Sequence, residues 1–154
     1  MDLATLLKPA SVRIVGRVSS KKRLFVAIAE TASATLGIDA ANAVDALIER
    51  ENLGPTGVGK GVALPHARLD GLEEIGGVFL RLDRPLEFES VDRQPVDLIF
   101  ALFAPRTAGV EHLKALALVS RTMRDPAVCA KLRANSDPAA LHAILTETPA
   151  SKAA

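Results

Sequence analysis

The sequence VDLIFALF at residues 96–103 decides the fold class of this chain. It leads into the longest uninterrupted apolar run, which extends from Leu98 to Pro105. A strand here would be apolar on both faces, as expected for a central strand that helices cover on both sides. The run is far shorter than the ~20 residues that a helix needs to cross a bilayer. We therefore predict a central strand in a layered fold and no membrane insertion.

Two helices are predicted before the glycine-rich middle of the chain. The first spans residues 20–36, where apolar residues recur at every fourth position, with Ser19 as its N-cap and Gly37 at its end. The second spans residues 40–51, with Asp39 as its N-cap.

Three more helices are predicted after the central strand. The first covers residues 110–123, and its inward residues are predicted to be Leu113, Leu116, Ala117 and Val119. The pairs Asp125-Pro126 and Asp137-Pro138 are each typical of an N-cap followed by proline at the first helical position. They predict short helices at residues 127–134 and 139–146.

Further strands are expected at residues 12–18 and 75–82, with a polar connection over residues 83–95. Strands and helices alternate loosely, which indicates the α/β class. The length of 154 residues is ordinary for one domain. We predict a single domain over residues 6–147, built as a central mixed β-sheet flanked by helices on both faces. Residues 148–154 are predicted to be a flexible tail.

Charge and composition exclude several classes of function. Lys and Arg total 19 and Asp and Glu total 18, and a net charge of +1 provides no global field to attract nucleic acid. Trp and Tyr are absent, which disfavours a base-stacking surface. The single cysteine, Cys129, excludes an internal disulfide, and the N-terminus lacks a signal-peptide pattern. We expect a cytoplasmic protein that does not bind nucleic acid.

Residues 54–60, GPTGVGK, match the G-x-x-x-x-G-K core of a nucleotide-binding P-loop. The next residue of a P-loop is Ser or Thr, whose hydroxyl holds the magnesium ion, but here it is Gly61. A P-loop also follows a strand and opens a helix, whereas here a predicted helix precedes it and the sequence VALP follows. Nucleotide hydrolysis is therefore disfavoured, and a glycine-rich turn without a ligand remains open.

His66 offers a better explanation of the same segment. Residues 61–64 predict a short buried strand that reaches the sheet edge and is stopped by Pro65, so that His66 projects from its end. Imidazole is a good nucleophile near neutral pH and takes a phosphoryl group without a metal. Backbone N–H groups of the glycines can approach phosphate oxygens closely. Positive charge would come from Arg50, Lys60 and Arg68. The alternative is a histidine that only caps a turn.

His112 is the second candidate, because it lies in the first turn of a predicted helix, where free N–H groups and the helix dipole favour an anion. A solvated helix residue is its alternative. His142 is interpreted as a surface or packing residue, and Cys129 as a packed small hydrophobe and not a nucleophile. The spacing of the three histidines fits no zinc-ligand pattern, so neither a metal nor a cofactor is predicted.

Three ordered motifs resemble a known family. TGVGKGVALPH at residues 56–66 resembles the phosphorylation segment of the mannitol/fructose-type enzyme IIA domains of the phosphoenolpyruvate-dependent sugar phosphotransferase system. PVDLIFALFAP at residues 95–105 resembles the family's central strand, and HLKALALV at residues 112–119 resembles its histidine-bearing helix. Residues 77–98 are most similar to the nitrogen-regulatory branch of the family.

The resemblance implies a role for each matching residue. His66 would carry a phosphoryl group on Nε2, His112 would hydrogen-bond the phosphate or steady the ring, and Arg50 would neutralise the phosphate charge. The phosphate pocket would be lined by Thr56, Gly57, Gly59 and Lys60. Ala67 stands where the family commonly has glycine, and Lys60 where this branch often has a neutral residue.

The resemblance also implies partners. The donor would be an HPr-like phosphocarrier, itself charged from phosphoenolpyruvate by enzyme I. The output would be regulatory, through target proteins in nitrogen, carbon or potassium regulation, such as potassium transport or a sensor kinase. The main alternative is a regulatory binding module of the same fold that is never phosphorylated.

Overall fold

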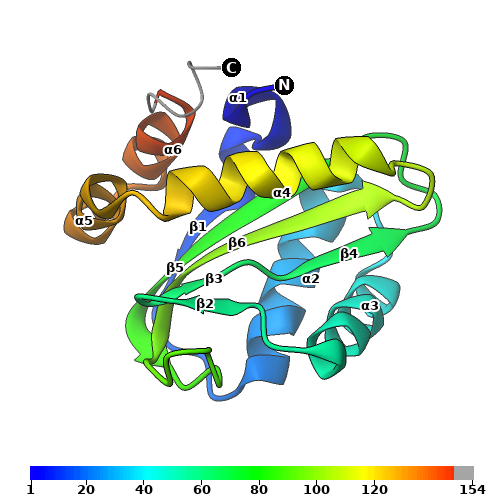
Figure 1. The fold of residues 1–154 in the computed structure, drawn as a ribbon. Coiled ribbons are helices and arrows are strands. Elements are labelled where there is room, and N and C mark those ends of the chain that lie inside the picture. Colours follow the sequence, from blue (N-terminus) through cyan, green and yellow to red (C-terminus); the bar gives the residue numbers. More distant parts are fainter. Residues whose placement is uncertain (148–154) are drawn as a thin grey trace.

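The computed structural model describes residues 1–147 as one six-stranded sheet with helices against both of its faces (Figure 1). The predicted tail at residues 148–154 lies outside the described residues. The strands run in the order β1-β5-β6-β3-β2, and β4 also pairs with β6. They are β1 (Val12–Val15), β2 (Gly57–Gly59), β3 (Val62–Ala63), β4 (His66–Leu69), β5 (Gly76–Leu86) and β6 (Val96–Pro105). Parallel and antiparallel pairs occur together, so the sheet is mixed, as predicted.

β6 is the central strand that the apolar run predicted. It pairs with β5 along one edge and with β3 and β4 along the other, and residues 98–104 are all buried. Its side chains alternate between the two faces of the sheet. One hydrophobic cluster takes Ile99, Ala101 and Phe103, and the other takes Leu98, Phe100 and Leu102.

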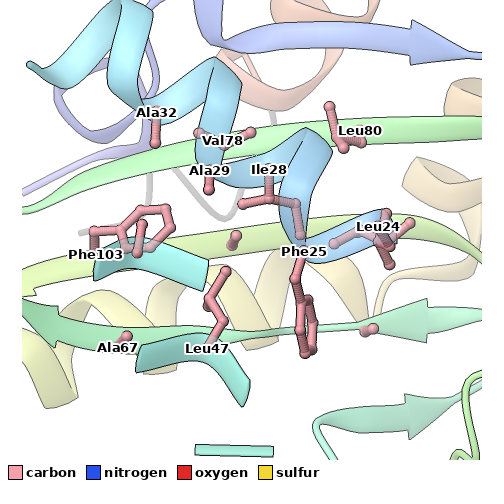
Figure 2. Close-up of a cluster of buried hydrophobic side chains, with 14 of the residues drawn as sticks. Leu24, Phe25, Ile28, Ala29, Ala32, Leu47, Ala67, Val78, Leu80 and Phe103 are labelled. Atoms are coloured by element: carbon pink, nitrogen blue, oxygen red, sulfur yellow. The ribbon is translucent and has the colours of Figure 1, made fainter. Parts of the chain in front are cut away.

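Helices cover both faces, which confirms the predicted fold class. One face carries α2 (Lys21–Leu36) and α3 (Ala40–Leu53), and Figure 2 shows Phe25 and Leu47 from these helices packed in one cluster with Phe103. The other face carries α1 (Leu3–Leu6), α4 (Val110–Met123), α5 (Pro126–Ala134) and α6 (Pro138–Thr146). A 3₁₀ turn, η1 (Pro9–Ser11), leads into β1. Within residues 1–147 no helix has the length and apolarity that crossing a membrane requires.

Most predicted helix ends are confirmed, with two corrections. The hydroxyl that caps α2 belongs to Ser20, not Ser19: Ser20 Oγ accepts from the N–H of Arg23 at 3.1 Å. Gly37 ends that helix in the left-handed conformation, and Asp39 caps α3. Because nothing stops α3 before Gly54, it extends to Leu53, two residues beyond its predicted end.

The prolines at the starts of α5 and α6 also lie where they were predicted. Pro126 and Pro138 are the first residues of these helices. The carboxylates of Asp125 and Asp137 accept hydrogen bonds from backbone N–H groups two residues further on. These starts were predictable because an Asp-Pro pair fixes both the cap and the first helical φ angle.

α4 has the predicted bounds but a different buried face. Leu113 is 63% exposed and Ala117 is also exposed, so the prediction that they face the core is wrong. The buried residues of this helix are His112, Ala115, Leu118, Val119, Thr122 and Met123. Apolar residues occur on more than one side of α4, so their spacing alone did not select the face that packs on the sheet.

The strands differ from prediction at three points. β1 ends at Val15 rather than residue 18, and β5 continues to Leu86 through part of the predicted polar connection. The third point concerns Pro65, which interrupts a strand without ending it: β3 and β4 both run parallel to β6, before and after the proline. The Pro65 carbonyl still accepts from the N–H of Leu102 at 3.0 Å, so the pairing continues through the break. His66 is therefore the first residue of an unpredicted strand.

Candidate functional site

The side chain of His66 has a fixed ring orientation. Its Nδ1 lies 3.0 Å from the carbonyl oxygen of Leu64, and its Nε2 lies 3.2 Å from Nε of Arg50. A carbonyl accepts and a guanidinium donates, so these partners assign the proton to Nδ1 and a lone pair to Nε2. Burial lowers the pKa of His66 below its ordinary value, while the Leu64 contact opposes that shift and the Arg50 charge adds to it. The ring is thus neutral at pH 7, with Nε2 available as a nucleophile.

Arg50 is held by the end of its own helix. It lies in the last turn of α3, and its Nη1 donates to the carbonyl of Gly54 at 2.9 Å. The next residue, Glu51, has a side chain that is only 6% exposed. Its carboxylate accepts from Lys21 Nζ at 3.1 Å and from both the backbone N–H and the hydroxyl of Thr56. These bonds fold residues 54–56 back onto α3, which keeps the Gly54 carbonyl beneath Arg50.

His112 meets His66 from the opposite side of the site. It lies in the first turn of α4, and the centroids of the two rings are 5.6 Å apart at an interplanar angle of 72°. His112 Nδ1 accepts from Nε of Arg68 at 3.2 Å, while its Nε2 is buried without a hydrogen-bond partner. Burial, followed by the influence of His66 and Arg68, lowers the pKa of His112 to about 4. Both rings are therefore uncharged near neutral pH.

The two rings open into a surface hollow of about 440 Å³. Three arginines line it, Arg50, Arg68 and Arg106, together with one carboxylate, Glu49. Its apolar lining includes two strongly exposed leucines, Leu53 at 82% and Leu113 at 63%. An excess of guanidinium groups around neutral imidazoles suits a phosphate-sized anion, and exposed leucines at its rim suit a transient protein contact.

The structure brings together only part of the predicted site. His66, His112, Arg50 and Arg68 share the hollow, whereas Thr56, Gly57, Gly59 and Lys60 are not among its lining residues. Thr56 is buried and bonded to Glu51, as described above. The backbone N–H of Lys60 donates to the Asp92 carboxylate at 2.8 Å.

The glycines of this segment have a packing role. A Cβ on Gly57 would overlap the hydroxyl of Ser90 and lie 2.9 Å from its Cα, so the backbone of β2 approaches residues 87–95 more closely than a larger residue allows. Gly59 and Lys60 both have positive φ angles, at the turn between β2 and β3. The P-loop-like stretch therefore leads into a two-stranded turn and not into a helix.

Sequence reasoning missed three contributors to the hollow and its support. Glu51 carries no signal in the sequence, since its role depends on the return of residues 54–56 to the helix end. Arg106 follows β6 and pairs with Asp70 at 2.8 Å, a contact between segments far apart in the chain. Leu53 lies beyond the predicted end of the helix at residue 51, although α3 includes it. Tertiary contacts place Glu51 and Arg106, and the full length of α3 places Leu53.

The remaining candidates lie elsewhere. A ring nitrogen of His142 is 2.9 Å from the Leu7 carbonyl, and Cys129 is buried, so both pack as predicted. Within residues 1–147 no group of three or more His, Cys, Asp or Glu side chains is arranged to hold a metal ion.

Comparison with known proteins identifies the family. Residues 5–148 match the family described as phosphoenolpyruvate-dependent sugar phosphotransferase system, EIIA 2. The chain belongs to this enzyme IIA family. It is 44% identical over 153 residues to the nitrogen regulatory protein of Bradyrhizobium diazoefficiens, covering 99% of this chain and 100% of the relative. It is 37% identical over 150 residues to the nitrogen regulatory protein of Escherichia coli K12, covering 96% and 91%.

Solved structures agree on the fold of this enzyme IIA domain. The crystal structure of the nitrogen regulatory protein IIA-Ntr from Neisseria meningitidis superposes with a TM-score of 0.85 at 34% identity, over 94% of this chain and 99% of that one. The enzyme IIA for mannitol from Escherichia coli, in its complex with phosphorylated enzyme IIB, gives a TM-score of 0.77 at 20% identity, over 93% and 100%. The resemblance noted in the sequence is thereby confirmed at the level of the family.

Proposed function

We propose that this enzyme IIA domain is a regulatory phosphocarrier that accepts a phosphoryl group on Nε2 of His66 from an HPr-like phosphocarrier in the cytoplasm. The arrangement of His66 supports this most directly: its Nδ1 is occupied by the Leu64 carbonyl, and its Nε2 lies against Arg50 in an arginine-lined hollow. A nucleophile beside a fixed positive charge is what phosphoryl transfer requires, since the protein mainly positions the reactants and neutralises charge.

The transfer is an exchange between two nitrogens. The lone pair on His66 Nε2 forms a bond to phosphorus as the phosphorus–nitrogen bond of the donor phosphohistidine breaks, and that electron pair returns to the donor nitrogen. The Nδ1 proton stays on the His66 ring, where its bond to the Leu64 carbonyl stabilises the positive charge that the ring gains. Arg50, which lies against Nε2, offsets the charge of the phosphoryl oxygens.

A regulatory output fits the relatives, which are named nitrogen regulatory proteins. Phosphorylation would convert a hollow rich in guanidinium groups into one holding a dianion, and a target protein would distinguish the two forms by charge. The proposed targets are proteins of nitrogen, carbon or potassium regulation, such as a potassium transport protein or a sensor kinase. A binding module of the same fold that is never phosphorylated is the second candidate, favoured by the exposed leucines at the rim.

Phosphoryl uptake separates the two candidates. The purified chain is incubated with phosphoenolpyruvate, enzyme I and an HPr-like carrier, and its intact mass and phosphopeptides are measured. One acid-labile phosphate on His66, absent when the carrier is omitted, is expected. An unmodified chain beside a demonstrably charged carrier would contradict the proposal and leave the binding module.

A further inference from the structure

Arg68 contacts a histidine of the hollow directly. His66 and Arg68 are alternate residues of β4, so they lie on the same face of the strand. Ala67 and Leu69, between and after them, pack into the cluster under α2 and α3. Arg68 therefore faces the side where α4 lies, and there its Nε donates to Nδ1 of His112 at 3.2 Å.

That contact determines which nitrogen of His112 carries the proton. A neutral imidazole has one N–H and one acceptor nitrogen, and the acceptor here is Nδ1. The N–H of His112 is therefore on Nε2, the atom that is buried without a partner in a residue only 4% exposed. An unpaired buried donor is costly and uncommon, and it calls for an acceptor that arrives with a ligand.

We infer that Arg68 is a positioning residue for phosphoryl transfer, which holds His112 with Nε2–H free to donate to the phosphoryl group on His66. The inference rests on the proposed function, because a phosphoryl oxygen on His66 is the acceptor that the orphaned N–H lacks. The guanidinium acts through the imidazole: without its hydrogen bond, His112 is free to rotate or to move its proton to Nδ1, either of which presents a lone pair to an anion.

The other two arginines of the hollow have different partners. Arg50 is bonded to His66 and to the Gly54 carbonyl, and Arg106 is bonded to Asp70. Within residues 1–147, Arg68 is thus the only arginine of the hollow that donates a hydrogen bond to His112. Arg106→Met is accordingly a matched control, since it removes one charge from the same hollow without removing a bond to either ring.

The first measurement uses the unphosphorylated protein. The ¹⁵N shifts of the His112 ring, read by NMR at pH 7.5, are expected to show a protonated Nε2 and an acceptor Nδ1. Arg68→Met should shift both resonances toward those of exchanging tautomers, Arg68→Lys should restore them, and Arg106→Met should leave them unchanged. A wild-type ring protonated on Nδ1, or ring shifts unaffected by Arg68→Met, would overturn the inference.

The second measurement is the lifetime of the phosphorylated form. Losing a hydrogen bond to a charged group should shorten it by roughly tenfold in Arg68→Met, with recovery in Arg68→Lys. In a His112→Phe background, Arg68→Met should add little, because Arg68 acts through the ring that is already gone. An equal effect in both backgrounds would mean that Arg68 contacts the phosphate directly, and the positioning role would be wrong.

The two proposals fail in different ways. If the wild-type chain takes up no phosphate from a charged carrier, the proposed function fails, while the ring shifts still report whether Arg68 sets the His112 tautomer. If the chain is phosphorylated normally and the lifetime is the same in Arg68→Met, the proposed function stands and the positioning role of Arg68 is refuted.

Discussion

Two regions of this molecule gather arginines, carboxylates and close backbone, and they differ in how their polar groups are paired. In the corner formed by Lys60, Asp92, Asp97 and Arg133, Arg133 donates three bonds to the Asp97 carboxylate and one to the Lys60 carbonyl. In the hollow, one buried imidazole N–H has no partner and a nucleophilic lone pair meets only an arginine. Groups that satisfy one another stabilise a fold, whereas groups left incomplete await a ligand.

The most severe change is expected from His66→Ala. The variant should take up no phosphoryl group, since no other ring in the hollow has its Nε2 lone pair directed to an arginine. Its fold should persist, because the His66 ring is only partly buried. Intact mass after incubation with the charged carrier, with circular dichroism as a control for folding, checks both points. A phosphorylated His66→Ala variant would mean that a residue other than His66 accepts the phosphoryl group.

The variant Gly57→Ala tests a residue that packs outside the hollow. An added Cβ would overlap Ser90, which is itself buried, so the free energy of unfolding should fall by about 2–3 kcal/mol. Phosphoryl uptake at a temperature where the variant is folded should stay close to wild type. Urea unfolding measures the first effect and the carrier assay the second. A stable variant that has lost phosphoryl uptake would instead place Gly57 in the phosphate pocket.

The buried imidazole of His112 predicts a pH effect on stability. Its pKa is about 4 in the folded protein and near 6.5 when unfolded, so between these values only the unfolded chain binds the proton. The free energy of unfolding should therefore fall as the pH falls below 6.5, by about 2 kcal/mol at pH 5 from this residue alone. Urea unfolding at pH 7.5 and pH 5 should show a smaller loss in His112→Gln. Equal losses in the two proteins would mean that His112 is not held neutral.

Arg133→Leu should have the smallest effect. It breaks a bidentate ion pair that is partly exposed and the bond to the Lys60 carbonyl, and we expect a loss of about 1 kcal/mol in the free energy of unfolding. The rate of phosphoryl uptake should not change, because Arg133 lines a different part of the surface. Rapid-quench measurements compare this rate with that of the wild type. A slower transfer would mean that the corner around Arg133 influences phosphoryl transfer in the hollow.

The sequence predicted well those features that depend on neighbours in the chain. The Asp-Pro starts of α5 and α6, the glycine after α2 and the doubly apolar β6 each follow from a few consecutive residues. The motif around His66 and the family resemblance also named His66, His112 and Arg50, which the structure brings together in the hollow, while their roles stay a proposal.

Features that depend on distant segments were not predictable. The buried face of α4 is selected by what lies on the sheet beneath it, and the pairing of β4 with β6 by atoms more than thirty residues away. Lys60 belongs to the same motif as His66. Its backbone N–H instead donates to the Asp92 carboxylate, and no local sequence pattern predicts that contact. The motif identified the candidate residues, and tertiary contacts determine which of them lie together in the hollow.

The interruption of the strand at Pro65 has a consequence for regiochemistry. Phosphohistidine exists as two isomers, and a free imidazole in water gives both. Here the break between β3 and β4 leaves the Leu64 carbonyl facing the ring of a residue two positions later, and one of the two nitrogens is blocked by the protein's own backbone. In the phosphoryl transfer proposed above, the path of the main chain would therefore select the isomer before any donor arrives.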